Sequence, residues 1–184
     1  MYYVPYMFTY QHPYYVHGPL NNYGTQSVYW APPNENRFNY YRSSTNDRSI
    51  SLMDYGPEPY VVNINEATKQ NNTYRTALWT GSHLQMTVMS INVGEDIGLE
   101  MHPNLDQFLR IEQGQGFVQM GKSKDQLNFE KNVYDDSAII IPAGTWHNLT
   151  NTGETPLKLY SIYAPPNHPF GTVHVTKADA IDAE

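Results

Sequence analysis

Four side chains in two separated stretches of the chain carry the donor atoms that a metal site requires. The stretch "IGLEMHPNLDQFLRIEQGQG" contains Glu100, His102 and Gln107, and the later stretch "IPAGTWHNLTN" contains His147. Two imidazoles, one carboxylate and one amide oxygen form a coherent ligand set for a divalent transition metal. Such an ion keeps positions open for a substrate diol, ketone or dioxygen, so the same residues permit catalysis.

The competing interpretation is that these residues are ordinary polar residues of a β-sheet. Each of them alone is more often a surface residue or a satisfied core residue than a metal ligand. Burying all of them without a cation, however, would leave lone pairs unpaired and a carboxylate unneutralised, which is costly. The combination therefore predicts a metal site, in which Glu100 is a ligand or, if unbound, a general base.

The spacing of these residues suits two strand pairs of one barrel. Residues two apart on an extended strand point to the same face, which places Glu100 and His102 together on a strand over 97–102. A turn through "PNLD" then returns Gln107 beside His102, and His147 opens a later strand after the "PAGTW" turn. In a closed barrel the four side chains can converge near one mouth.

The neighbours of the candidate ligands predict the lining of the pocket. Leu109 and Ile111 share the face of Gln107, and Leu149 shares that of His147, so we expect a largely apolar wall. The tail "PPNHPFGTVHVTK" is expected to be a lid or a segment that covers a sheet edge. Whether its two histidines reach the pocket stays open.

The chain from residue 61 onward has the pattern of a β-protein. Short runs of apolar and β-branched residues are separated by turn signals such as "NVGED", "EQGQG" and "NTGETP". Many short strands with regular turns indicate a sandwich or barrel and not a βαβ fold. A helical turn capped by Asn63 and a short C-terminal helix capped by Thr176 complete the prediction. The expected strands are 73–80, 83–91, 97–102, 107–111, 117–121, 127–134, 137–141, 147–150 and 157–163.

The first 58 residues differ in composition from the rest. Residues 1–60 hold twelve of the chain's 16 tyrosines, together with seven prolines and no lysine. This segment cannot bury a core of its own, so we divide the chain into an irregular Tyr-rich arm over 1–58 and a barrel with its tail over 59–184. The arm is either laid on a folded surface or adhesive, because tyrosine offers apolar area and a polar tip. We expect it to join copies of the chain into a dimer or higher homo-oligomer.

Composition excludes several classes of function. A net charge of −7 and the lack of a basic run argue against nucleic acid and against an anionic membrane surface. The absence of cysteine excludes disulfides and thiolate metal sites. The start "MYYVPYMFTYQHPYY" lacks the basic and apolar regions of a signal peptide, and no run approaches the ~18 apolar residues of a membrane helix. We therefore expect cytoplasmic synthesis and a small-molecule ligand.

The stretch around the first three candidate ligands resembles the first motif of the cupin superfamily. That motif has a Gly, five residues, His-x-His, three or four residues, a Glu, six residues and a Gly. The corresponding positions here hold Gly94, Glu100, His102, Gln107 and Gly114. A Glu thus stands where the first His is usual, and a Gln stands where the Glu is usual.

The later stretch resembles the second cupin motif, which has a Gly, five residues, Pro-x-Gly, two residues, a His, three residues and an Asn. Pro142, Gly144, His147 and Asn151 match it, while Asp136 replaces the opening Gly. The spacing agrees throughout both motifs. The resemblance covers residues 61–175 and implies a double-stranded β-helix, or jelly-roll, barrel with an irregular arm and a short C-terminal helix attached.

The resemblance also implies a metal and its ligands. In a cupin, Glu100, His102, Gln107 and His147 would bind one divalent ion. This set is similar to the zinc ligands of type I phosphomannose isomerases, so zinc is expected first, with manganese and iron as close alternatives. Small cupins of this kind are often labelled mannose-6-phosphate isomerase-like, but this chain is too short for that enzyme's other domains. It also resembles cupins of spore-forming bacteria, some of which carry Tyr-rich leaders.

Two classes of function follow. The first is a metal-dependent enzyme, isomerase-like or dioxygenase-like, acting on a small sugar-like or keto or diol substrate, with Glu100 as its catalytic residue. The alternative is a non-catalytic structural protein, deposited on a spore coat or a similar layer, in which the barrel is a scaffold. A carbohydrate-sensing module would need aromatic rings at the barrel mouth, where Trp146 and Phe108 are the candidates.

Overall fold

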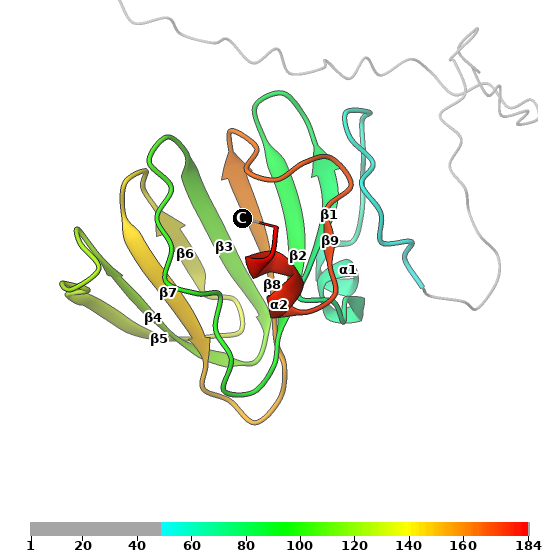
Figure 1. The fold of residues 1–184 in the computed structure, drawn as a ribbon. Helices are drawn as coiled ribbons and strands as arrows, with labels where there is room; N and C mark the ends of the chain where they lie inside the picture. The colour runs from blue at the N-terminus through cyan, green and yellow to red at the C-terminus, as the bar shows by residue number, and fades with distance from the viewer. Residues whose placement is uncertain (1–48, 184) are drawn as a thin grey trace, which may run out of the picture. The chain divides into compact units, whose positions relative to one another are not determined.

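Antiparallel strands are the main secondary structure of residues 49–183, the part of the chain that this computed structural model describes (Figure 1). Residues 1–48, most of the predicted arm, lie outside the described residues, so its proposed role in assembly stays a prediction. The strands are β1 (Arg75–Thr80), β2 (Gln85–Ile91), β3 (Asp106–Gln113), β4 (Gln115–Gly121), β5 (Phe129–Tyr134), β6 (Ala138–Ile141), β7 (Trp146–Asn151), β8 (Leu157–Ala164) and β9 (Val173–His174). The helices are α1 (Ile64–Gln70) and α2 (Lys177–Ile181). The predicted all-β class and the short C-terminal helix are confirmed.

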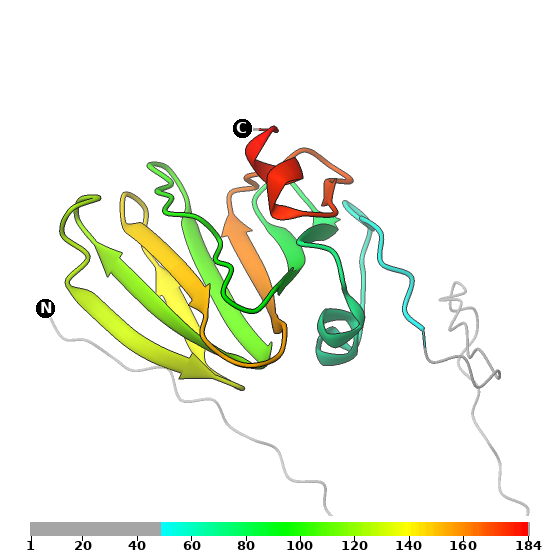
Figure 2. The ribbon, with the colours of Figure 1, turned by 60° about the horizontal axis from the view of Figure 1, so that its bottom comes forward.

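The strands form two sheets that face each other, as Figure 2 shows. The six-stranded sheet has the order β6-β3-β8-β2-β1-β9, and the three-stranded sheet has the order β5-β4-β7. Because β8 pairs with both β2 and β3, the last long strand lies between two that precede it by many residues. Long connections between neighbouring strands in a sheet are typical of jelly-roll barrels.

The core lies between the inner faces of the two sheets. Alternating residues of β3, β4 and β7 are buried, which is the period-2 pattern of strands with one face inside. Leu109 and Ile111 from β3 meet Val118 from β4 and Leu149 from β7, and Leu159 from β8 belongs to the same cluster. This apolar layer fixes the register of both sheets, since a shift by one residue would turn it outward.

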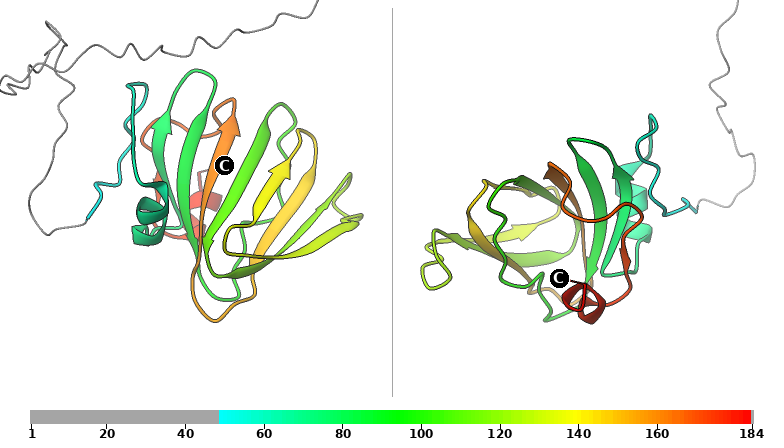
Figure 3. Two further views of the ribbon diagram at one scale, coloured as in Figure 1. Left: turned by 180° about the vertical axis from the view of Figure 1, so that it is seen from behind. Right: turned by 45° about the horizontal axis from the view of Figure 1, so that its top comes forward.

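Helix α1 covers the outer face of the six-stranded sheet (Figure 3). The side chain of Asn63 caps its first turn by accepting a hydrogen bond from the Glu66 N–H, as predicted. The end of the predicted arm, residues 49–58, lies along β1, where Tyr55 N–H donates to the Leu78 carbonyl at 2.9 Å. Ile50 packs against the same outer cluster.

The C-terminal tail crosses the edge of the six-stranded sheet before it ends in α2. Strand β9 pairs with β1, which supports the prediction of an edge-covering segment. The side chains of Thr176 and Asp179 form a complete capping box on α2, and Ala180 is buried against the core. Lys177 in α2 pairs with Asp96 at 2.5 Å. Among the described residues, neither helix is long or apolar enough to cross a membrane.

The attachment of α2 is expected to weaken in acid. Burial raises the pKa of Asp96, but hydrogen bonds from Lys177 and from the Gly98 N–H outweigh it and lower the pKa. Because the folded pKa lies below the unfolded one, this contribution is present above the ordinary pKa of 3.8 and is lost as pH falls through the lowered pKa. Hydrogen exchange in α2, corrected for its intrinsic rate, will speed up in that window. A Lys177→Met chain, already lacking the ion pair, should show a smaller acid-dependent change; an equal change would contradict this account.

Candidate metal centre

The segment that carries Glu100 and His102 is not the strand that the sequence predicted over 97–102. It makes only isolated bridges to β7, at Asp96 and at Glu100. Gly98 interrupts it with a φ of 87°, a conformation that favours glycine. The prediction of a continuous strand was therefore wrong. Isolated backbone bridges to β7 position the candidate ligands instead.

One of these bridges joins the two motifs directly. The Glu100 N–H donates to the His147 carbonyl at 3.0 Å, and the His147 N–H donates to the Glu100 carbonyl at 2.9 Å. Residues that exchange both bonds lie opposite each other, so their side chains leave the backbone on the same face. The Gly144 N–H also donates to the His102 carbonyl at 2.8 Å, and Gly144 has a φ of 76°. The Pro-Ala-Gly turn is thus held against the first motif.

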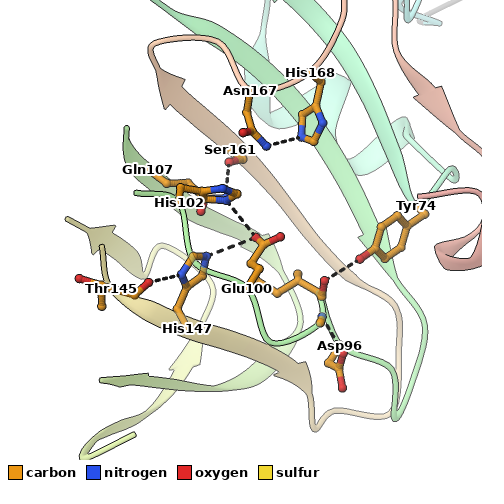
Figure 4. Close-up of polar contacts among 12 residues, drawn as sticks. Tyr74, Asp96, Glu100, His102, Gln107, Thr145, His147, Ser161, Asn167 and His168 are labelled. Carbon is orange, nitrogen blue, oxygen red and sulfur yellow. Dashed lines mark hydrogen bonds and ion pairs between the residues drawn. The ribbon is translucent and has the colours of Figure 1, made fainter. Parts of the chain in front are cut away.

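Three predicted ligands meet at one point, with Glu100 between the two imidazoles (Figure 4). Its Oε1 lies 3.3 Å from His147 Nε2 and 3.4 Å from His102 Nε2. One donor atom from each of the three residues lies within 4.8 Å of the others. His147 is fully buried, whereas the side chains of Glu100 and His102 keep 18% and 15% of their surface exposed on the pocket side.

The surroundings of Glu100 keep its carboxylate ionised. Burial raises the pKa of this group, but the contacts with His102 and His147 lower it further, to about 2. A carboxylate with such a pKa carries its full charge at neutral pH. The site therefore presents one negative charge and two ring nitrogens to the same small space.

The partner of the other ring nitrogen sets the tautomer of His147. Its Nδ1 lies 2.9 Å from the Thr145 carbonyl oxygen, which can only accept, so Nδ1 carries the hydrogen. In the neutral ring the lone pair then sits on Nε2, which points at the Glu100 carboxylate. Two hydrogen-bond acceptors 3.3 Å apart repel each other unless a metal ion lies between them or one of them is protonated. The geometry thus calls for a metal ion or a proton at this position.

Gln107 is placed beside His102 on the barrel floor (Figure 4). Its side chain is buried, and its Nε2 donates to the Ser161 hydroxyl at 3.1 Å. The other amide atom, Oε1, has no hydrogen-bond partner among the described residues, and neither has His102 Nε2. Buried polar atoms are nearly always paired, so both atoms suit a metal ion. The role of Gln107 as a fourth ligand stays a prediction.

A pocket of about 570 Å³ opens above Glu100 and His102. Its lining mixes polar and apolar side chains and contains none of the three residues expected to form an apolar wall, so that prediction was wrong. The leucines and the isoleucine expected there lie in the core instead. Trp146 lines the pocket as expected, whereas Phe108 packs against Tyr160 with their ring centroids 6.0 Å apart.

Both histidines of the tail reach this pocket. His174 in β9 pairs in register with Arg75 in β1, and His168 lies in the loop before it. The His168 ring is 5.1 Å from that of Tyr163, which is 5.9 Å from the ring of His102. Burial and the charge of Arg75 lower the pKa of His168 to about 3, so its ring is neutral at physiological pH.

Arg75 and Lys124 also line the pocket and were not predicted from the sequence. No local pattern could have identified Arg75, because the pairing that brings the tail to it spans about a hundred residues. Lys124 lies in the turn between β4 and β5, and the sequence of this turn is typical of an ordinary hairpin loop.

Known proteins resemble this chain in sequence and in fold. A family profile described as a cupin domain matches residues 87–163. The uncharacterized protein YrkC of Bacillus subtilis (strain 168) is 69% identical over 188 residues, and the match covers 100% of both chains. A crystal structure from Bacillus halodurans is 66% identical with a TM-score of 0.71, covering 71% of this chain and 99% of that one. A Klebsiella pneumoniae protein with a double-stranded β-helix domain has a TM-score of 0.50 at 18% identity, covering 64% of this chain and 98% of that one.

Proposed function

Because the chain belongs to the cupin superfamily, we propose that its barrel is a metal-dependent enzyme for a small oxygenated substrate. The proposed ligands are Glu100, His102, Gln107 and His147. Zinc is the first candidate, and manganese and iron are close alternatives for a site with two imidazoles and one carboxylate. The pocket above the ligands has the volume of a small-molecule site.

The contact between Glu100 and His147 carries this proposal. With its Nδ1 hydrogen on the Thr145 carbonyl, a neutral His147 would direct its lone pair toward the Glu100 carboxylate, and a divalent ion or a proton would satisfy both groups. Gln107 Oε1 has no hydrogen-bond partner among the described residues, and His102 Nε2 has only the ion-pair contact with Glu100, so both atoms could also bind the ion. A single ion would therefore resolve several unfavourable contacts that protons could resolve only one by one.

Residues around the ion would have separate roles in the reaction. A bound divalent ion would supply Lewis acidity toward a carbonyl or hydroxyl oxygen of the substrate. Thr145 fixes the tautomer and orientation of His147, and Ser161 orients the Gln107 amide by accepting a hydrogen bond from it. Glu100 lines the pocket, where it would be a ligand of the ion or, if unbound, the general base that takes a proton from the substrate. These roles suit isomerase-like and dioxygenase-like reactions alike.

Metal removal and return test the proposal. Full-length protein is stripped with a chelator and reloaded separately with zinc, manganese or ferrous iron, and its metal content is measured by mass spectrometry. We expect one ion per chain, and turnover of small keto or polyol compounds only in a reloaded form. The Glu100→Gln chain should lose turnover, while the exposed Glu154→Gln control should keep it. A protein that retains no metal, or that is equally active when stripped, would contradict the proposal.

A further inference from the structure

The pocket above the candidate metal centre is positively charged, although the whole chain is acidic. Its described lining contains two cationic side chains, Arg75 and Lys124, and one anionic side chain, Glu100. The net charge of the chain is −7, so cations gathered at one pocket are not a general property of its surface. A divalent ion at the centre would add to this excess. A pocket with this balance attracts anions and repels cations.

Arg75 brings its charge into the interior of the barrel. The residue is 2% exposed and occupies the first position of β1, where it pairs with Met89 on one side and His174 on the other. A guanidinium held between two strands has little freedom to move. Burial raises the pKa of Tyr163 and lowers that of His168, and the charge of Arg75 lowers the pKa of both. Its field therefore reaches the groups that flank the candidate ligands.

Lys124 provides a second cation at the mouth of the same pocket. It is exposed in the turn between β4 and β5, and its Nζ lies 4.7 Å from the centroid of the Trp146 ring. This cation–π contact holds the flexible side chain beside the entrance. Trp146 directly precedes the candidate ligand His147, so the ammonium group and the metal centre border one cavity.

Another part of the pocket lining, formed by the loop after β8, is anchored and polar. The backbone N–H groups of Asn167 and His168 donate to the buried Gln85 Oε1 at 3.2 and 2.9 Å, which anchors the loop after β8. The side chains of both residues line the pocket (Figure 4). They offer hydrogen bonds but no charge, because His168 is neutral. Recognition of a net charge in the substrate therefore falls to Arg75 and Lys124.

Resting on the proposed function, we infer that the substrate is an anion, a small hydroxy or keto compound that carries a carboxylate or phosphate group. The anionic group would bind between Arg75 and Lys124, while the hydroxyl or keto oxygens face Glu100 and His102. Charge-assisted hydrogen bonds of a guanidinium to carboxylate or phosphate are among the strongest polar contacts in proteins. Neutral sugars and polyols would lack this contact.

A matched series of ligands tests the inference by calorimetry on zinc-loaded full-length protein. Glycerol is neutral, glycerate adds a carboxylate to the same diol, and glycerol 3-phosphate adds a phosphate. We expect at least one of the two anions to bind about tenfold more tightly than glycerol or better. The preferred anion identifies the head group. An affinity for glycerol equal to that for both anions, or no binding by any of the three, would overturn the inference.

Variants of the two cations locate the contact. Lys124→Met should weaken binding of the preferred anion several-fold and reduce its salt dependence, whereas Lys122→Met, an exposed lysine of the same turn outside the pocket lining, should change neither. Arg75→Gln should weaken binding further, and Arg75→Lys should restore part of the loss. Circular dichroism checks that both variants are folded.

An anion affinity that is unchanged in Lys124→Met and in a folded Arg75 variant would contradict the inference. Normal zinc content without anion preference would reject the substrate class alone, whereas failure to take up zinc would reject the proposed function itself.

Discussion

A chain that carries both His102→Ala and His147→Ala will bind zinc at least about a hundredfold more weakly than the unchanged chain. Loss of a residue that merely orients a ligand already costs about 10- to 100-fold in metal affinity. The double variant removes two of the proposed direct ligands and leaves only one carboxylate and one amide. Competition with a fluorescent zinc chelator measures the affinity, and mass spectrometry measures the metal content of the purified protein.

The control for this experiment is His83→Ala, which removes an exposed histidine before β2 that lies away from the centre. Its zinc affinity should equal that of the unchanged chain. His147 is buried, so a second variant, His147→Gln, tests the ligand with less loss of volume. Unchanged zinc stoichiometry in the folded double variant would remove these histidines from the metal centre.

Replacement of Asn151 by alanine will cost about 2–4 kcal/mol of folding free energy, because it removes three hydrogen bonds and leaves the buried Ile91 carbonyl without this partner. The Asn151 Nδ2 donates to the carbonyls of Ile91 and Thr155, both at 2.9 Å, and its Oδ1 accepts from the Gly153 N–H at 2.9 Å. The residue is 1% exposed, and its bond to the Ile91 carbonyl is buried, so water cannot replace that bond. The side chain therefore ties the end of β2 to the turn between β7 and β8.

Denaturation by urea measures this cost against Asn132→Ala, an exposed asparagine in β5 that should change stability by less than about 0.5 kcal/mol. Asn151→Asp tests the direction of the bonds, since a carboxylate keeps the shape but cannot donate to the two carbonyls when ionised. It should be destabilised as well. Equal stability of the Asn151→Ala and Asn132→Ala chains would show that the motif asparagine has no structural role.

Most of the fold was predictable because its signals are local. Short runs of apolar and β-branched residues between turn signals predicted the strands, and the capping residues Asn63 and Thr176 predicted both helices. The motif spacing also predicted that Glu100, His102 and His147 would meet, as they do. Asp136, which replaces the opening glycine of the second motif, has a φ of 68°, the backbone conformation that usually favours glycine. Aspartate is one of the few residues other than glycine that tolerate this conformation.

The failures concern features that depend on tertiary context. The segment over 97–102 has the composition of a strand, but Gly98 breaks it and leaves only bridges to β7. The pocket wall was assigned from strand faces, yet part of its polar lining comes from Arg75 and the tail, which meet through the pairing of β1 with β9. Pairing between segments so far apart leaves no trace in the local sequence pattern.

The central place of β8 in the six-stranded sheet has a consequence for the order in which the protein is made. During translation β2 and β3 leave the ribosome first, but the strand that joins them, residues 157–164, is synthesised only after four more strands. Until then β2 and β3 each have an unpaired edge, which can associate with other chains. Ser161, the residue that orients Gln107, also belongs to this late strand. The barrel, with the candidate metal centre inside it, can therefore close only after β8 has been made.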